Sequence, residues 1–471
     1  MNSINTYLDT FKVTIPQMES LVGTALSHGG DFADLYFEHT TFFNLLLKDG
    51  VVSSGGFHTD YGVGIRVLKG EKTGYAYSES TEMQDMVKAA EAASAIALGC
   101  DASLRFAAVA DRKLDMYPMT RNWRDDGADA FLPFIKELEK SIFEKDSRIV
   151  KVIIRMSDSV STVMMYNSLG ELTVDNRPMG SVAATAVFEQ DGKTENKSAA
   201  RSFRMGAELA GPALVRELAD EVVKGIDARF EARRPKGGQM NVVMGAGASG
   251  ILLHEAMGHA FEADFNRKGQ SIFSDKMGQR ICPKGVNVVD DGTVAFNRGS
   301  GNYDDEGVAG EKTYMVTDGI LTSYLHDRIS ASWYGVRPTG NGRRENFRYN
   351  PIPRMRATYM ESGDADPQSI IADVTQGIYV DEFSNGQVKI GEGDFTFFVK
   401  SGYLIENGRL TMPVKDINII GNGPQALADI LAVGNDLKID NGTWTCGKEQ
   451  SVAVSCGMPT VLVRNLTVGG E

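Results

Sequence analysis

The sequence predicts an α+β protein of two domains: an N-terminal domain of helices with a mostly antiparallel sheet, and a β-rich C-terminal domain that carries a metal-binding helix. Three observations support this prediction. The first half of the 471 residues mixes segments of helical and of strand periodicity. The strands of that half have short connections, which favour antiparallel pairing. The second half has many glycine-containing turn signals and few helical segments.

Helical periodicity marks four segments of the first half. The first follows Thr14, a favourable N-cap with Pro16 in the first turn, and ends before Gly29. Further helices are predicted from the apolar spacing over 83–90 and 131–142 and over about 212–230. Strands are predicted at 33–47, 61–77, 149–156, 160–166, 171–176 and 181–189.

A charged stretch containing proline and glycine, 233–238, separates the two halves, and the predicted domains are 1–235 and 236–471. Beyond it the sequence predicts a strand at 240–244, a helix at about 248–262 and another near 424–432. Hairpin turns are predicted where Asp-Gly or Asn-Gly lies between apolar runs. These pairs are Asp291-Gly292, Asp318-Gly319, Asn385-Gly386 and Asn407-Gly408.

Composition restricts the partners and the compartment. The formal net charge of -13 disfavours binding to nucleic acid or to an anionic membrane over the whole surface. Four cysteines in a chain of this length do not make a disulfide framework. The N-terminus has no signal-peptide pattern, and the longest weakly polar run, 242–253, is too short to cross a bilayer. We therefore expect a cytoplasmic protein without a membrane segment.

Residues 251–261, ILLHEAMGHAF, place two of the six histidines and a glutamate in an otherwise apolar helix. Burying three such groups without partners costs several kcal/mol, so they need hydrogen-bond partners or a metal. The five-residue separation of His254 and His259 would splay the two rings by ~140° on a regular helix. Both can reach one ion only if the helix gains a residue, as in a π-bulge. Gly258 is the residue that would tolerate such strain best.

A zinc site with two imidazoles needs at least one more protein ligand and an open position for water. The candidates in the second half are Glu262, Asp264, Cys282, His326, Cys446 and Cys456. Glu262 could be a third ligand or could support one. Cys446, beside Gly447 and near Lys448, is typical of an accessible loop thiolate, whereas Cys456 lies in an apolar run typical of core packing. Spacing alone does not choose among them.

Four other features have simpler interpretations. The glycines of 245–250 resemble a dinucleotide fingerprint, but Asp264 lies on the same helix, so a tight strand-to-helix turn is the better interpretation. Five arginines in 343–356 could contact nucleic acid, but substrate or structural roles are favoured in so acidic a chain. The run 304–306 suggests a solvated acidic turn, and Trp444 suggests a packed aromatic.

Several motifs in one order carry a resemblance to a known family. HEAMGH, FEAD, SIFSDKMGQR, DDEGVAGE, PTGNGRREN and the terminal CGKEQS and NLTVGG together resemble the TldD/PmbA family, in its TldD branch. The resemblance covers the C-terminal half, and the order of elements in the N-terminal half also fits. It implies a metalloprotease in which His254, His259 and Cys446 bind zinc and Glu255 is the catalytic glutamate.

The predicted function is that of a zinc-dependent peptidase. The resemblance further implies small or unfolded peptides as substrates, such as precursor peptides or antitoxins. It also implies a homodimer, or a heteromer with a homologous subunit that lacks the metal motif. Two alternatives remain: a non-catalytic protein in which the metal is structural, and a gyrase-associated regulatory or nucleic-acid-binding protein.

Overall fold

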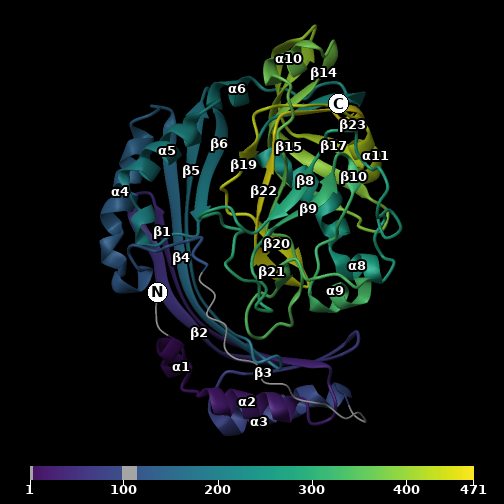
Figure 1. The fold of residues 1–471 in the computed structure, drawn as a ribbon. Helices are drawn as coiled ribbons and strands as arrows, with labels where there is room; N and C mark the ends of the chain where they lie inside the picture. The colour runs from purple at the N-terminus through teal and green to yellow at the C-terminus, as the bar shows by residue number, and fades with distance from the viewer. Residues whose placement is uncertain (1–3, 98–113, 471) are drawn as a thin grey trace.

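The computed structural model describes residues 4–97 and 114–470, and its first half is built on one strongly curved antiparallel sheet (Figure 1). The strand order is β3-β2-β1-β4-β5-β6. The bounds are β1 Phe32–Lys48, β2 Val51–Lys69, β3 Lys72–Ser78, β4 Ile149–Asn167, β5 Leu172–Gln190 and β6 Lys193–Phe203. The predicted α+β class and the antiparallel pairing are confirmed.

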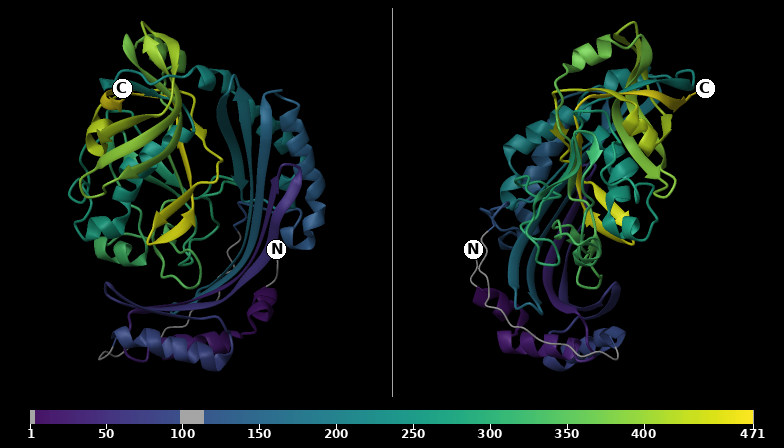
Figure 2. Two further views of the ribbon diagram at one scale, coloured as in Figure 1. Left: turned by 180° about the vertical axis from the view of Figure 1, so that it is seen from behind. Right: turned by 45° about the vertical axis from the view of Figure 1, so that its right-hand side comes forward.

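Helices cover the convex face of this sheet in two groups (Figures 1 and 2). One group packs on the β1–β3 end through α1 Ile4–Phe11, α2 Ile15–Ala25 and α3 Met83–Ser94. The other packs near β4–β6 through α4 Leu132–Phe143 and α5 Pro212–Val223, with α6 Ile226–Glu231 following. Thr14 caps α2 as predicted, with a capping box to Gln17. The predicted helix over 212–230 is instead two helices, because Gly225 adopts φ +73° between them.

Two strands of this sheet are longer than predicted. The four short strands expected over 149–189 are the two continuous strands β4 and β5, and the segment 61–77 is the hairpin of β2 and β3. The gap left between the predicted strands 149–156 and 160–166 is part of β4, and its residues Ser157, Asp158 and Ser159 line a cavity. Polar residues in mid-strand therefore mark the lining of that cavity, not a chain reversal.

The C-terminal half contains a ring of strands closed by the pairing of β14 with β15. Around the ring the order is β14-β7-β23-β17-β15, with β16 added to β15 and β18 to β23. The bounds are β7 Gly238–Met244, β14 Gln376–Val388, β15 Asp394–Glu406, β16 Arg409–Val414, β17 Ile417–Asn422, β18 Ile430–Val433 and β23 Val461–Gly469. Closure pairs the strand edges that an open sheet would leave free. The boundary predicted at residue 235 falls between α6 and β7 and remains a prediction.

A second sheet lies beside the ring, with the order β10-β9-β8-β13-β22-β19. Its strands are β8 Val288–Asp291, β9 Lys312–Thr317, β10 Ile320–Leu321, β13 Ala357–Met360, β19 Lys438–Ile439 and β22 Ser455–Met458. Two small hairpins pair β11 Gly342–Arg343 with β12 Ile352–Pro353, and β20 Thr445–Lys448 with β21 Gln450–Ala453. The short α-helices are α7 Ile251–Leu253, α8 Ala263–Arg267, α9 Arg328–Tyr334, α10 Pro367–Ala372 and α11 Gly423–Ala428. The predicted helix near 424–432 therefore ends early, at Ala428.

Two of the four predicted hairpin turns are correct. Asp318-Gly319 joins β9 to β10, and Asn407-Gly408 joins β15 to β16, with positive φ at all four residues. Asp291-Gly292 only ends β8, and Asn385-Gly386 lies inside β14 where its register with β15 is irregular. Single-turn 3-10 helices occur at Ala95–Ala97, Trp123–Asp125, Ala128–Ala130, Ala207–Leu209, Ala248–Gly250 and His259–Phe261.

Buried ion pairs join the two halves. Asp304, Asp305 and Glu306 are between 1 and 5% exposed, so the predicted solvated turn is wrong. Glu306 lies 2.6 Å from Arg66 of β2, and Asp305 lies 2.5 Å from Arg177 of β5. These acids neutralise arginines of the sheet that would otherwise be buried without a counter-charge. The concave face of the N-terminal sheet is therefore held against the C-terminal half by paired charges.

Phe347 is a second point of attachment, and a glycine makes room for it. Its ring lies against Gly62 of β2, where any Cβ would meet the ring. Its backbone N–H donates to Glu38 at 2.8 Å, and its carbonyl accepts from the Tyr75 hydroxyl at 2.6 Å. A side chain at position 62 would push this segment off the sheet.

No helix in 4–97 or 114–470 is long and apolar enough to cross a bilayer. Cys282, Cys446 and Cys456 carry free thiols, and Cys100 lies outside the described residues.

We predict that Gly62→Ala destabilises the protein by about 1–3 kcal/mol, the usual cost of overpacking a filled site. Gly56→Ala is the matched control, because it lies on the same strand and a Cβ there meets nothing within 4 Å. Denaturant unfolding of both variants measures the difference. Equal stability of the two would contradict the proposed role of Gly62 in docking Phe347.

Candidate metal centre

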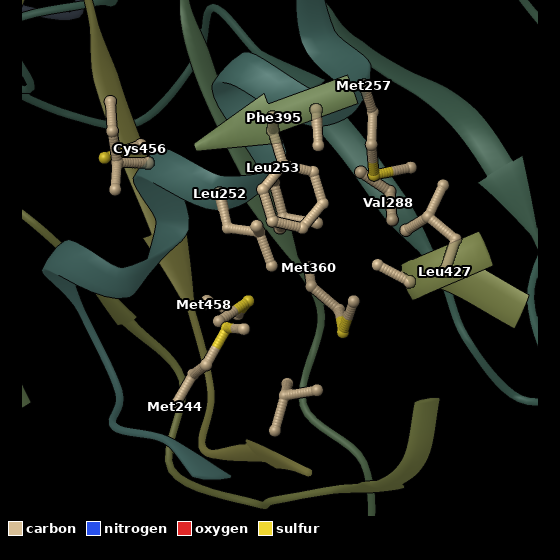
Figure 3. Close-up of a cluster of buried hydrophobic side chains, with 14 of the residues drawn as sticks. Met244, Leu252, Leu253, Met257, Val288, Met360, Phe395, Leu427, Cys456 and Met458 are labelled. Carbon is tan, nitrogen blue, oxygen red and sulfur yellow. The ribbon is translucent and has the colours of Figure 1, made fainter. Parts of the chain in front are cut away.

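The metal-binding segment begins where β7 ends, at a turn built from glycines. Gly247 has φ +101°, a conformation that favours glycine, and a Cβ on Gly250 would collide with the backbone of Gly457 in β22. The glycines of 245–250 thus serve the predicted tight turn, and Gly250 also allows a close approach between backbones that was not predicted. Leu252, Leu253 and Met257 of the following helical turns point into the buried core (Figure 3).

The two histidines lie at the ends of a π-helical turn. The π-helix spans His254–Gly258, and a 3-10 turn, His259–Phe261, follows directly. The widened turn brings the two imidazole rings to 5.2 Å between centroids at an interplanar angle of 80°. The π-bulge expected from the five-residue spacing is therefore present.

The reason for glycine at position 258 differs from the prediction. Gly258 has φ -55° and ψ -51°, an ordinary helical conformation, so no strain is relieved there. A Cβ at this position would instead collide with the sulfur of the buried Met355. Gly258 therefore lets the π-turn pack closely against the segment that precedes β13.

Cys446 completes a cluster of three donors. It lies on the hairpin of β20 and β21, and its Sγ is 3.2 Å from Nε2 of His259. Ligand atoms of His254, His259 and Cys446 lie within 4.8 Å of one another, and all three residues are buried. Nδ1 of His254 has no hydrogen-bond partner among the described residues. Two imidazoles, a thiol and an unsatisfied buried ring nitrogen fit a zinc ion.

The surroundings of Cys446 differ from the predicted accessible loop. The residue is 4% exposed and lies on a strand. Burial raises the pKa of its thiol, but His254 and His259 outweigh burial and lower that pKa to about 5. Lys448, the expected neighbour of the thiolate, instead contacts acidic side chains on the metal-binding helix. The histidines therefore favour the thiolate, which is the form that binds a metal.

Glu262 is the fully buried carboxylate that supports the cluster. His259 Nδ1–H donates to its Oε2 at 2.9 Å, which leaves Nε2 directed toward Cys446. Lys448 lies 3.0 Å from Oε2, and Arg354 lies 3.7 Å from Oε1. Burial raises the pKa of Glu262, but Lys448 and His259 outweigh burial and lower this pKa to about 2. Burial lowers the pKa of His259, but Glu262 outweighs burial and raises it to about 10.

Arg354 and Lys448 attach the cysteine hairpin to the helix. Arg354 donates to the carbonyls of Cys446 and Gln450, each at 2.7 Å, and Lys448 also lies 2.8 Å from Asp264. From the sequence, Lys448 was named only as a neighbour of Cys446 and Arg354 only as part of the arginine-rich segment, and their contacts with Glu262 were missed. The period of two along a strand could have placed Lys448 on the same face as Cys446, whereas nothing in the sequence pairs Arg354 with the helix.

Glu255 lies on the π-turn between the two histidines. It is half-buried, and its carboxylate makes no hydrogen bond or ion pair with any described residue. Burial raises its pKa, and His254 and His259 act in the opposite direction. The carboxylate is therefore available to a water molecule beside the donor cluster.

The remaining ligand candidates lie outside the donor cluster. Asp264 pairs with Lys448, and Cys456 is packed in the core, as predicted (Figure 3). Cys282 is another core residue, whose pKa is raised by burial to about 12. His326 contacts Tyr334 edge to face, and burial lowers the pKa of His326 to about 4. Trp444 is half-buried against the C-terminal core, in agreement with the predicted packing role.

The arginines of 343–356 do not form an exposed basic surface. Arg343, Arg344, Arg354 and Arg356 are at most 6% exposed. Arg348 pairs with Asp60 and Glu79 of the N-terminal half. A surface that binds a nucleic-acid backbone needs accessible cations. This segment therefore does not support the nucleic-acid-binding alternative.

Comparison with known proteins places the chain in a family. Models of the PmbA/TldA metallopeptidase match along the sequence: domain 1 at residues 33–97, the central domain at 121–228 and the C-terminal domain at 237–470. A metalloprotease TldD homolog of Haemophilus influenzae is 36% identical over 448 residues, covering 93% of each chain. A metalloprotease of Methanocaldococcus jannaschii is 31% identical, covering 91% of this chain and 95% of its own.

Solved structures share the fold. A putative modulator of DNA gyrase from Thermotoga maritima superposes with a TM-score of 0.78 at 23% identity, covering 97% of this chain and all of that one. TldE from Thermococcus kodakarensis gives a TM-score of 0.76 at 18% identity, with 96% of this chain and all of that one covered. With family models along both halves and relatives above 30% identity over nine-tenths of its length, the chain belongs to the TldD/PmbA family of metallopeptidases.

Proposed function

We propose that this protein is a zinc-dependent peptidase whose centre consists of His254, His259, Cys446 and Glu255. The observation that carries the proposal is the meeting of three donor atoms within 4.8 Å beside an unpaired carboxylate. The metalloprotease names of the relatives support a protease that uses a metal.

The donor set determines which ion is proposed. Two imidazoles and one thiolate are a set that zinc accepts in catalytic sites, with one position left for water or substrate. When bound, zinc supplies polarisation of the scissile carbonyl and a lowered pKa of water. Glu262 holds the His259 ring in the orientation required for binding through Nε2.

Glu255 is the proposed general base. Its carboxylate has no hydrogen-bond or ion-pair partner among the described residues, and burial raises its pKa, which favours acceptance of a proton. It would accept the proton of the attacking water and transfer it to the leaving amine. The histidines on either side act against burial and limit the rise of that pKa.

Small or unfolded peptides are the proposed substrates, in the class of precursor-peptide maturation or antitoxin degradation. The three donor residues are 3 to 6% exposed, so a folded domain would not reach them, whereas an extended chain has a small cross-section. The outermost strands of the described sheets, among them β6 and β19, could pair with such a chain or with a second subunit. We also propose that the protein works as a homodimer or with a homologous subunit that lacks the metal motif.

A structural metal is the rival function, and the burial of the ligands favours it. A metal ion that only stabilises the contact between the histidine helix and the cysteine hairpin would not require a general base beside it. The unpaired Glu255 has no evident use in that case, so its replacement separates the two functions.

The first prediction concerns the ligand set. His254→Ala, His259→Ala and Cys446→Ala should each lose bound zinc, because each removes one of three donors, while Cys456→Ala should retain it. Elemental analysis of protein purified without added metal measures occupancy. Full zinc occupancy in Cys446→Ala would contradict the assignment.

The second prediction separates binding from catalysis. Glu255→Gln preserves shape but cannot accept a proton, so zinc should stay bound while peptide hydrolysis falls by about 10²-fold or more. Metal content and turnover are measured on the same preparation. An unchanged rate would show that Glu255 is not the base and would favour the structural metal.

The third prediction tests the close packing of the π-turn. Gly258→Ala should weaken zinc binding, because the added methyl group displaces the turn from Met355. Combining it with Met355→Ala should restore binding, since the space is returned. Gly447→Ala is the control, because a Cβ there meets nothing within 4 Å although it is adjacent to Cys446. Zinc competition titrations measure all variants, and failure of the double variant to recover would argue against this cause.

The fourth prediction concerns substrate and assembly. One peptide, presented free and within a stably folded domain, should be cleaved only in the free form. The protein is assayed alone and mixed with the motif-lacking homologue from the same cell, with its mass measured in solution. Equal cleavage of both forms by a monomer would defeat the proposal for both substrate and partner.

A further inference from the structure

A cavity of about 550 Å³ lies between the concave face of the N-terminal sheet and the C-terminal half. One wall comes from β1, β4 and β5, and the other comes from segments around residues 298–305, 343–345 and 443–453. Cavities of this size are in the range that holds small ligands. The proposed peptidase centre does not use this space.

The cavity and the metal centre adjoin the same hairpin, but none of the residues His254, Glu255, His259 and Cys446 lines the cavity. Thr445 and Ala453 line the cavity and form a directly opposed pair of β20 and β21. Cys446 is the next residue along β20, so its side chain points to the other face, toward the histidines. The cavity is therefore a separate site.

Six arginines line this cavity, and two of them have acidic partners. Arg177 lies 2.9 Å from Asp175 and 2.5 Å from Asp305. Arg344 lies 3.9 Å from Asp34. The guanidinium groups of the other four have no carboxylate oxygen within 4 Å among the described residues. These four, here called the arginine cluster, are Arg204, Arg298, Arg343 and Arg356.

The guanidinium groups of three members of the arginine cluster bond only to neutral groups among the described residues. Arg298 donates to the Trp444 carbonyl at 2.9 Å and to the Ser202 hydroxyl at 2.7 Å. Arg343 donates to the carbonyls of Met355 and of Ala453. Arg356 donates from Nε to the Gly340 carbonyl at 2.6 Å. These bonds orient the guanidinium groups but do not neutralise them.

Arg204 has no such bonds. Its side chain donates no hydrogen bond to a described residue, and its Nε is buried without a partner. The residue is only 9% exposed, and its guanidinium lies over the Tyr117 ring at 5.3 Å. A buried guanidinium without a counter-charge destabilises the folded protein. A negatively charged ligand in the adjacent cavity would supply that counter-charge.

The acidic groups of the cavity are engaged elsewhere or lie on the N-terminal sheet. Asp305 pairs with Arg177, Glu345 accepts from the Ser451 amide, and Glu38 accepts from the Phe347 amide. Asp158 of β4 has no ion-pair partner within 4–97 and 114–470, and burial raises its pKa to about 7. Burial and, to a smaller extent, the charge of Arg356 lower the pKa of Arg343 well below its ordinary range. Burial and, to a smaller extent, the charge of Arg204 lower the pKa of Arg298 to about 10. Positive charge therefore accumulates at the arginine cluster.

We propose that the cavity binds a small ligand through an oxyanion group, a carboxylate or a phosphate, held by Arg204, Arg298, Arg343 and Arg356. Guanidinium groups bind both oxyanions in bidentate geometry, and their hydrogen bonds to an ionised acceptor are stronger than those to neutral carbonyls. The ligand neutralises charge that the protein itself leaves unpaired. The site is a binding site in its own right and does not depend on the peptidase proposal.

Calorimetric titration of the full-length protein tests this, in Tris chloride buffer free of phosphate and of added metal. Inorganic phosphate and triglycine distinguish the two oxyanions, and triglycine amide lacks the carboxylate. We expect saturable binding of phosphate or of triglycine, with triglycine amide inactive and with affinity falling as salt rises. Absence of binding by both, or equal binding of triglycine and its amide without phosphate binding, would overturn the proposal.

Variants locate the binding in the cavity. Arg204→Met removes a charge that makes no hydrogen bond with the described residues, so it should weaken binding about tenfold or more. Arg201→Met is the matched control, because Arg201 lies outside the cavity and pairs with Glu217. Arg298→Gln provides a second test if Arg204→Met does not fold, as judged by thermal unfolding. Unchanged affinity in a folded Arg204→Met or Arg298→Gln variant, or an equal loss in Arg201→Met, would refute the assignment.

Discussion

The candidate centre depends on the contacts that Glu262 makes with His259 and Lys448. This fully buried carboxylate accepts from His259 and pairs with Lys448, so it joins the histidine helix to the cysteine hairpin, which lies about 180 residues further along the chain. Arg354 adds a third connection through Glu262 and the carbonyl of Cys446. Because a buried carboxylate is tolerated only with such partners, the pairing that neutralises Glu262 also brings Cys446 opposite the imidazoles.

The same principle organises the contact between the two halves of the protein. Arg66 and Arg177 project from the concave sheet, and Glu306 and Asp305 of the C-terminal half neutralise them. The cavity between the two halves is lined by both kinds of arginine. Arg177 has acidic partners there, whereas the guanidinium groups of the arginine cluster have none among the described residues, and this contrast distinguishes a structural ionic contact from a candidate ligand site.

Local sequence was sufficient for several features that short-range rules set, although the same rules were wrong for the turns at Asp291-Gly292 and Asn385-Gly386. The capping box at Thr14, the turns at Asp318-Gly319 and Asn407-Gly408, and the π-turn between His254 and His259 all follow from neighbouring residues. Other predictions that were wrong concern residues whose environment is set from a distance. The connection expected at 157–159 is part of a long strand, and the run 304–306, expected to be solvated, is buried against arginines of the sheet.

For the candidate centre, the sequence by itself determined that two histidines and a glutamate share one helix and that a regular helix could not bring the histidines together. It did so because helical geometry ties position to angle over a few residues. Which of the distant candidates joins them, why position 258 must be glycine, and that Lys448 serves Glu262 were decided only by the tertiary structure. These depend on contacts between segments about 100 to 190 residues apart, whose approach is set by core packing and buried charge pairing and leaves no periodic signal in the chain.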